Sequence, residues 1–292
     1  MGKNWMRRYR LKCGVQGGTG FEIGSEMNED NETLHISFSV EKSDSESSNT
    51  AKVQIWNLAP ENISILEQKD CIVELSAGYE SGQAVILLGN VTVATTTTDN
   101  ADRMTELDVV DGRAALRDTY ITVSINGAVN TKTVYDTIAA QMGVSVMYAD
   151  ELQYATIPDG FAFVGKAATA LTKVTGCNGH TWTIQNGVLQ ITYPGRPIAA
   201  QGYEISADTG LVDVPKRITI SSSTSSSETL SGYEITFLLN GAIGVNDIVV
   251  LESKNVSGYF RVYKMTIDGD NMSGDWICTA QVLQVAQMPQ TT

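Results

Sequence analysis

Side chains suited to acid–base or metal chemistry are scarce, because the 292 residues include only two histidines, His35 and His180. His35 lies in an alternating run over 34–40, so we interpret it as a strand residue. His180 follows Cys177 in the order Cys-Asn-Gly-His, and such a pair could supply two zinc ligands. A closed zinc site needs four ligands, and no second pair has a credible spacing. We therefore expect turn residues at Cys177–His180 and no bound zinc.

Acidic residues gather before position 112. Paired carboxylates could perform acid–base chemistry on a sugar. Glu106 and Asp108 fall on the same face of an alternating strand, which suits a solvated face equally well. We therefore favour a solvated face, and we predict no catalytic, cofactor-binding or metal-binding residue in this chain. The cluster consists of Asp99, Asp102, Glu106, Asp108 and Asp111.

Two other segments match ligand-binding loops only in part. Asp268-Gly269-Asp270-Asn271 resembles the start of a calcium loop, but the closing Glu of an EF-hand is absent. A glycine-rich segment lacks both the dinucleotide-binding spacing and the Lys-Ser/Thr pair of a phosphate loop. We expect hairpin turns at both places. The glycines concerned are Gly14, Gly17, Gly18, Gly20 and Gly24.

The charge balance excludes several classes of protein. Lys and Arg number 20 against 33 Asp and Glu, for a net charge of −13, which argues against sequence-independent binding of nucleic acid and against a basic membrane-surface patch. No stretch approaches the ~20 apolar residues of a membrane helix, so we expect no membrane insertion. The basic N-terminus has no apolar core after it, so we expect no signal peptide. The cysteines show no Cys-x-x-Cys spacing, and we interpret them as reduced core thiols of a protein made in the cytosol: Cys13, Cys71, Cys177 and Cys278.

The elements that must position these residues are mostly strands. In the first third, short runs rich in β-branched residues alternate with period 2 and end at Gly, Asn, Asp or Ser, which predicts a sandwich or barrel. One short helix interrupts them, with Pro60 in its first turn and Ile63 and Leu66 on one face. The runs are 34–40, 51–58, 72–79, 84–89, 90–94 and 105–110.

The pattern changes near residue 119. Thr131 or Thr133 can cap a helix that ends at Met142 before Gly143, and a second helix is expected over about 165–175, stopped by Gly176. The 181–184 and 188–191 runs flank Asn186-Gly187, which is a strong hairpin signal. From Tyr203 onward strands return, interrupted by the serine-rich segment Ser221–Ser227, whose role the sequence leaves open.

The resulting fold class is mainly β (α+β), with two tube-like β-barrel modules bracketing a small α/β module. We predict the modules at 1–117, 118–200 and 201–292.

Specific segments resemble the baseplate hub family of contractile phage tails, which includes phage late control protein D. The stretch 51–58, the following helix and 73–79 resemble the first domain of these hubs, and Gly89-Asn90-Val91 and Asp111-Gly112 fit the same scheme. The segments that resemble the second barrel are 207–212, 232–240, 247–253, 258–262 and 274–276.

The resemblance implies a structural protein of the virion tail and no enzyme. Its expected partners are two further copies of itself, the tail tube protein, the central spike protein and other baseplate proteins. Three copies would form a ring that joins the six-fold tube to the three-fold spike, with DNA only as passing cargo along a net negative lumen. The alternatives are a tail-carried cell-wall hydrolase, or a tail-tip protein of a non-contractile phage or phage-like secretion device.

Overall fold

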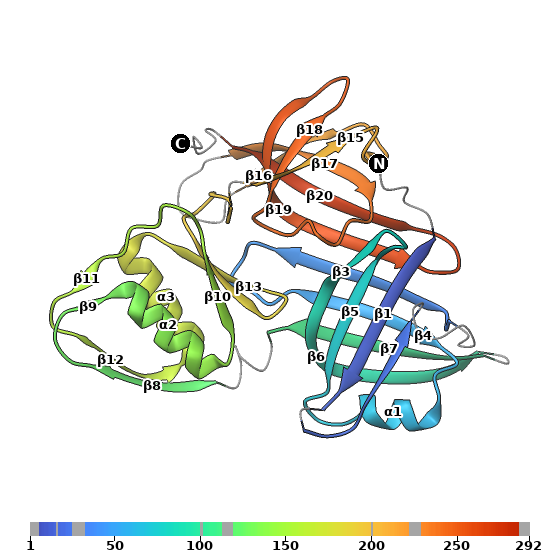
Figure 1. Cartoon of the computed structure of the whole chain (residues 1–292), viewed down its shortest axis with the longest axis horizontal. Coiled ribbons are helices and arrows are strands. Elements are labelled where there is room, and N and C mark those ends of the chain that lie inside the picture. Colours follow the sequence, from blue (N-terminus) through green and yellow to red (C-terminus); the bar gives the residue numbers. More distant parts are fainter. Residues whose placement is uncertain are drawn as a thin grey trace.

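The computed structural model describes residues 6–15, 17–24, 33–99, 102–112, 119–199, 201–221 and 229–285. Within them strands dominate, which confirms the mainly β fold class. We divide the description into an N-terminal β region (6–112), an insert (119–199) and a C-terminal β region (201–285), which follow the colours of Figure 1 from blue to red. Of the serine-rich segment, residues 222–227 lie outside the described part of the chain.

The N-terminal β region alternates buried apolar and outward polar side chains along its strands. The predicted glycine-rich hairpin is confirmed, since β1 and β2 pair antiparallel. The predicted helix is also confirmed, with Pro60 at its start and Leu66 buried. The elements are β1 (Arg7–Gly14), β2 (Gly20–Gly24), β3 (Ile36–Ser43), β4 (Thr50–Trp56), α1 (Pro60–Leu66), β5 (Ile72–Tyr79), β6 (Gly82–Asp99) and β7 (Asp102–Asp111).

The C-terminal β region is built around the long strand β19. This strand pairs with β18, β20 and β3, and a bulge between Val262 and Lys264 marks where its pairing with β20 shifts. Asp268, Gly269 and Asp270 end strand β19, and only Asn271 lies in the turn before β20, so the predicted hairpin is present but its tip begins later than expected. The strands are β15 (Gly202–Ser206), β16 (Lys216–Ser221), β17 (Thr229–Leu238), β18 (Ile248–Glu252), β19 (Ser257–Asp270) and β20 (Trp276–Gln284).

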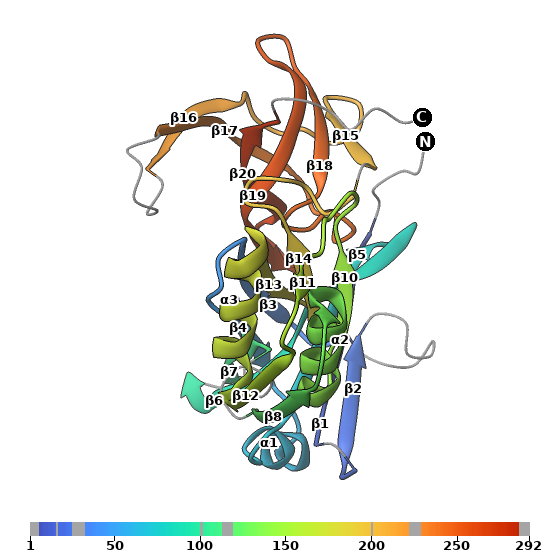
Figure 2. The ribbon, with the colours of Figure 1, turned by 90° about the vertical axis from the view of Figure 1, so that its left-hand side faces the viewer.

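The two β regions share one sheet. Antiparallel pairing of β3 with β19 makes the order β16-β17-β20-β19-β3-β4-β7-β6-β5-β1-β2, with β18 and β15 attached beside β19. One hydrophobic core also runs through both regions, from Leu11 and Val40 to Phe237 and Val282. Figure 2 shows the β16–β17 hairpin reaching out from the rest of this sheet.

The insert has a hydrophobic core of its own, in which α2 and α3 pack among short strands. Its β13–β14 hairpin is the predicted one, and Asn186 and Gly187 have the left-handed φ values of 50° and 74° that this tight turn needs. The elements are β8 (Tyr120–Ile125), β9 (Val129–Asn130), α2 (Thr131–Met142), β10 (Ser145–Tyr148), β11 (Thr156–Ile157), β12 (Phe161–Lys166), α3 (Ala167–Asn178), β13 (Thr181–Gln185) and β14 (Val188–Thr192).

The helix ends correct two sequence-based expectations and confirm a third. Asn130, and neither Thr131 nor Thr133, caps α2 by accepting a hydrogen bond from the backbone N of Lys132. Gly143 follows α2 in the left-handed conformation, as predicted. However, α3 begins at Ala167 and continues through Gly176 to Asn178, because Gly179 supplies the left-handed cap that ends it.

Candidate functional site

The two histidines take part in separate packing arrangements. His35 is expected within a strand over 34–40. The observed strand, β3, begins at Ile36, so His35 lies immediately before it. Its ring stacks on Trp56 at 3.9 Å between centroids, and its Nε2 lies 3.0 Å from Asp270 Oδ2. Burial alone would raise the pKa of Asp270, but hydrogen bonds from Ser273 N, His35 and Met272 N bring this pKa below its ordinary value. Asp270 of the calcium-like motif is therefore held by hydrogen bonds from the following turn and from His35.

Cys177 and His180 do not converge on a common ligand position. Cys177 is exposed, contrary to its expected place in the core, whereas the other three cysteines are buried. His180 is buried, and its Nδ1 lies 3.1 Å from the Tyr135 hydroxyl while its ring contacts Tyr193 at 5.0 Å. Among the residues that the structure describes, no three His, Cys, Asp or Glu side chains form a group that could hold a metal.

The acidic cluster separates into different environments. Glu106 and Asp108 project from one face of β7, where Lys52 lies 3.1 Å and 3.7 Å from their carboxylates. Hydrogen bonds from Gln54 and Lys52 lower the pKa of Glu106, which suits an ionised acceptor rather than a general acid. Asp111 points to the opposite, buried side, and Asp102 accepts a hydrogen bond from Asn57 elsewhere on the surface. The side chain of Asp99 lies outside the described set.

A continuous polar surface crosses from one β region to the other. Cross-strand pairing aligns Asp108, Lys52, Ser39 and Asp268 in a single row over β7, β4, β3 and β19. We call this surface the polar sheet face. It carries four carboxylates against two lysines, and its residues are Ser37, Ser39, Glu41, Lys52, Gln54, Glu106, Asp108, Lys264, Thr266, Asp268, Thr279 and Gln281.

The polar sheet face is hollowed where the two β regions meet. Ser39, Lys52, Gln54 and Asp268 line a depression of about 330 Å³. The apolar side of the same strands faces the shared core, so every second residue is committed to burial and the remainder to this surface. The result is a partly exposed, weakly acidic surface that extends over both regions.

The opposite end of β7 belongs to a buried polar contact with the insert, which we call the module junction: Lys42, Asn49, Asp111, Gln185 and Asn186. Asp111 accepts hydrogen bonds from the backbone N of Asn186 at 2.7 Å and of Gly187 at 3.1 Å. The amide of Asn49 donates to Asp111 and to Gln185. Burial raises the pKa of Asp111, although these hydrogen bonds act against the rise.

A second buried contact joins all three parts of the chain. The guanidinium of Arg261, on β19, donates to Asp44 Oδ2 and to Asn246 Oδ1, each at 2.7 Å. Asn246 in turn donates to Gln190 of the insert at 3.0 Å. Sequence reasoning missed Arg261 and the module junction, except for Asp111. The available signal was Lys42, which continues the inward-facing series Ile36, Phe38 and Val40 of β3.

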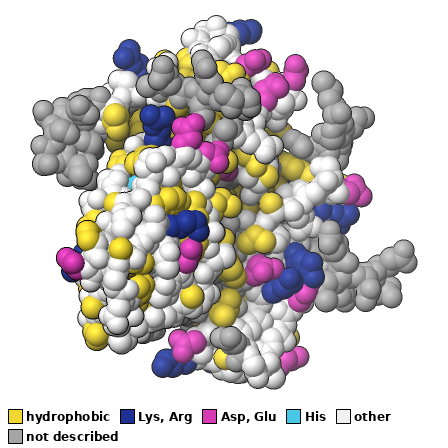
Figure 3. Space-filling view, turned by 60° about the vertical axis from the view of Figure 1, so that its left-hand side comes forward, with side chains coloured by type: hydrophobic (Ala, Val, Ile, Leu, Met, Phe, Trp, Pro, Cys, Tyr) yellow, Lys and Arg dark blue, Asp and Glu magenta, His cyan; other side chains and the backbone are white. Residues whose placement is uncertain are grey.

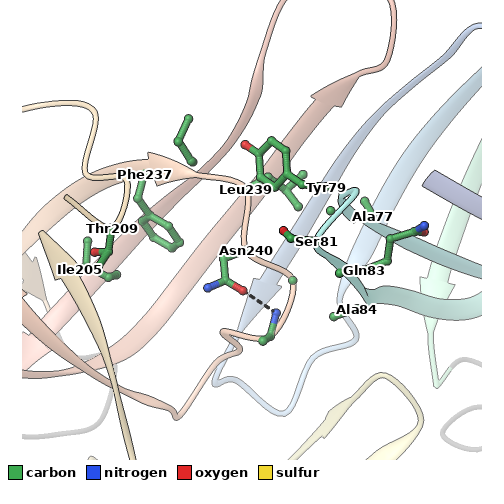
Figure 4. Close-up of a pocket in the computed structure, with 15 residues that line it drawn as sticks. Ala77, Tyr79, Ser81, Gln83, Ala84, Ile205, Thr209, Phe237, Leu239 and Asn240 are labelled. Atoms are coloured by element: carbon green, nitrogen blue, oxygen red, sulfur yellow. Dashed lines mark hydrogen bonds between the residues drawn. The ribbon is translucent and has the colours of Figure 1, made fainter. Parts of the chain in front are cut away.

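A pocket of about 280 Å³ lies at the seam between the β5–β6 hairpin and the segments around Thr209 and Asn240 (Figure 4). Trp276 helps close the seam by donating its indole N–H to the Gly78 carbonyl at 3.0 Å. The lining combines backbone with small and aromatic side chains, and it contains no Asp, Glu, His, Cys, Lys or Arg. This composition lacks the groups of a hydrolytic site and resembles a packing seam.

The surface of the insert is weakly charged. Figure 3 brings the insert forward, and on that face Lys and Arg side chains occur singly or beside acidic ones rather than as a basic patch. No helix among the described residues is long and apolar enough to cross a membrane. The face of the insert shown in Figure 3 therefore lacks a basic surface of the kind that binds the phosphates of nucleic acid.

No protein-family model and no curated protein matches this chain. Among solved structures, it is similar to the 43 kDa tail protein of prophage MuSo2 from Shewanella oneidensis, with 11% identity, TM-score 0.61, and coverage of 95% of this chain and 98% of that one. A tail protein from Neisseria meningitidis MC58 gives 12% identity, TM-score 0.58, and coverage of 94% and 96%.

An E. coli type VI secretion component, described as similar to T4 tail proteins gp27 and gp5, matches at 9% identity and TM-score 0.59. It covers 90% of this chain and 76% of that one. At these identities the likeness concerns the fold. The chain therefore has the fold of phage tail proteins and of this secretion component, which agrees with the resemblance to tail hubs found in the sequence.

Proposed function

We propose that this chain is a structural baseplate hub of a phage tail, made in the host cytosol and assembled into the virion. Three copies form a ring that joins the six-fold tail tube to the three-fold central spike. The observation that carries the proposal is the single sheet through two β regions, because each copy then offers two connected wall segments to the ring. The likeness in fold to tail proteins supports the same assignment.

In this proposal the modules predicted at 1–117, 118–200 and 201–292 have different tasks. The first and third are tube-like β-barrels that build the ring wall, and the insert contacts other baseplate proteins. The sheet ends at β2 and β16, whose outer edges pair with no strand of the described chain. Unpaired edges of this kind favour association with another chain.

We propose further that the polar sheet face lines the path of the DNA. A wall with more carboxylates than lysines repels phosphate, so the duplex can slide without being held. A variant with Glu106, Asp108 and Asp268 all changed to Lys should retain duplex DNA at low salt, whereas the unchanged protein should not. Binding of duplex DNA by the unchanged protein at physiological salt would contradict this part of the proposal.

Light scattering on the purified chain, alone and with its spike protein, tests the ring directly. We expect three copies per particle, and a ring of six copies would contradict the proposal. The secretion-device alternative has a specific observation in its favour, namely the type VI component among the similar structures. Locating the protein at the end of a purified tail, or in a secretion apparatus without a capsid, distinguishes the two.

The expectation that the chain is not an enzyme remains part of this proposal. A tail-carried cell-wall hydrolase would degrade peptidoglycan, and zymography on peptidoglycan measures that activity. We expect that this chain leaves the peptidoglycan in the gel intact. If clearing does occur, Glu106→Gln and Asp108→Asn would show whether these carboxylates are responsible.

A further inference from the structure

Lys42 is a buried cation whose hydrogen-bond partner is a carboxamide. It occupies an inward-facing position of β3, and its side chain is only 5% exposed. Within the described residues no carboxylate forms an ion pair with it, and its Nζ makes one hydrogen bond, to Asn186 Oδ1 at 2.8 Å. A buried ammonium is normally paired with a carboxylate, so a carboxamide is an unusual partner.

The carboxamide of Asn186 is held at both ends. Its Oδ1 accepts from Lys42, and its Nδ2 donates to the Val85 carbonyl at 3.0 Å. The backbone N of Asn186 is fixed by Asp111 at 2.7 Å. The 2.8 Å hydrogen bond therefore holds the amine next to a restrained carboxamide, at the oxygen bonded to the Cγ that it would attack.

Burial favours the uncharged, reactive form of the Lys42 amine, whereas the nearby Asp111, Cys278 and Asp247 favour its charged form. Burial lowers the pKa of Lys42 to about 8, so the uncharged amine is accessible in mildly alkaline solution. The buried carboxyl group of Asp111 lies at the same junction, with a raised pKa that burial causes. A desolvated lysine amine is a nucleophile of the kind used in covalent catalysis.

We propose that Lys42 and Asn186 join in an intramolecular isopeptide bond. The uncharged Nζ attacks Asn186 Cγ, the Cγ–Nδ2 bond breaks, and one proton passes from Nζ to Nδ2, which leaves as ammonia. The new bond is an amide between Nζ and Cγ, and the step needs no oxidant, metal or other reactant. Asp111 is a positioning residue, because it holds the backbone of Asn186 in place.

The bond would connect two distant parts of the chain. It links β3 of the N-terminal β region to the tip of the β13–β14 hairpin, across a sequence separation of 144 residues. In an Asn-Gly pair, attack of the glycine backbone N on the Asn Cγ competes with isopeptide formation. Here the N of Gly187 donates to Asp111 Oδ1 at 3.1 Å, so that atom is already engaged.

Intact-mass measurement and tryptic mapping of the full chain, after incubation near pH 9, test the proposal. We expect a mass below that of the sequence by one ammonia, and a branched peptide joining the peptides that contain Lys42 and Asn186. An unchanged mass with two linear peptides overturns the inference. A mass gain at Asn186, which indicates deamidation, also overturns it.

Two variants locate the bond. Lys42→Arg keeps the positive charge but should abolish both the mass loss and the branched peptide. Lys264→Arg makes the same change on the polar sheet face and should leave both intact. A branched peptide in the Lys42→Arg variant, or its loss in Lys264→Arg, contradicts the assignment. If Lys42→Arg does not fold, the branched peptide of the unchanged protein still decides the question, and this result does not depend on the proposed hub function.

Discussion

The polar sheet face and the buried contacts to the insert use the same charged side chains in opposite surroundings. Lys52 is 63% exposed and shares its charge between two carboxylates in water, whereas Arg261 is 4% exposed and has fixed partners. An exposed ion pair contributes little to stability, whereas a buried charge that loses its partner is costly. The difference implies that the sheet face is free to be selected for its charge, while the buried contacts fix how the parts of the chain sit together.

Removing a buried cation should have the largest effect. Arg261→Met leaves Asp44 and the Asn246 amide oxygen without their donor, so we expect the free energy of unfolding to fall by about 3 kcal/mol. Urea unfolding measures this change. A loss no larger than that of Lys52→Met would remove the distinction between the two surfaces.

Overfilling the apolar side of the same sheet should cost somewhat less. A Cβ on Gly269 would approach the Phe38 ring to 2.2 Å, and that ring already packs edge-on against Trp276. We expect Gly269→Ala to destabilise the protein by about 2 kcal/mol. Gly82→Ala is the matched control, because nothing lies within 4 Å of its added Cβ. Equal thermal stability of the two variants would contradict the expected clash.

The insert should be sensitive to mild acid through His180. Burial lowers the pKa of His180 below its ordinary value of 6.5, so the unfolded chain binds a proton more readily than the folded one. Stability should therefore decrease as the pH falls through 6.5 toward the folded pKa. Unfolding midpoints between neutral and mildly acidic pH should show this decrease, and His180→Gln should reduce it. An identical pH dependence in that variant would be evidence against His180 as the source.

The smallest effect is expected on the polar sheet face. Lys52→Met should change the free energy of unfolding only slightly, because its ion pairs are exposed to solvent, and the difference should shrink further in high salt. Unfolding at two ionic strengths checks this. A large, salt-independent loss would mean that Lys52 has a structural role like that of Arg261.

Local patterns were enough to predict much of this fold. Alternation located most strands, Asn186-Gly187 located the hairpin, and Gly143 marked the end of α2. Capping was harder, because Asn130, Thr131 and Thr133 are all residues that can cap a helix, and only the fold selects Asn130. The prediction that α3 ends at Gly176 was wrong. A glycine within a helix is tolerated at a cost of about 1 kcal/mol, so its presence alone does not end the helix.

Contacts between distant segments had no local signal. The pairing of β3 with β19 joins residues more than 200 positions apart, and neither strand indicates its partner. For the candidate surfaces, alternation correctly placed Glu106 and Asp108 on one face. The same alternation assigns Asp111 to the opposite face, but its partners Asn49 and Asn186 come from different parts of the chain and become neighbours only in the fold.

The β3–β19 pairing also has a mechanical consequence. Hydrogen bonds between antiparallel strands lie across the strand direction, so tension along the strands loads the whole ladder at once. Tension across the strands would instead open the ladder one bond at a time. A pull that separates the two β regions along β3 and β19 therefore loads this seam in shear, which is its stiffer direction.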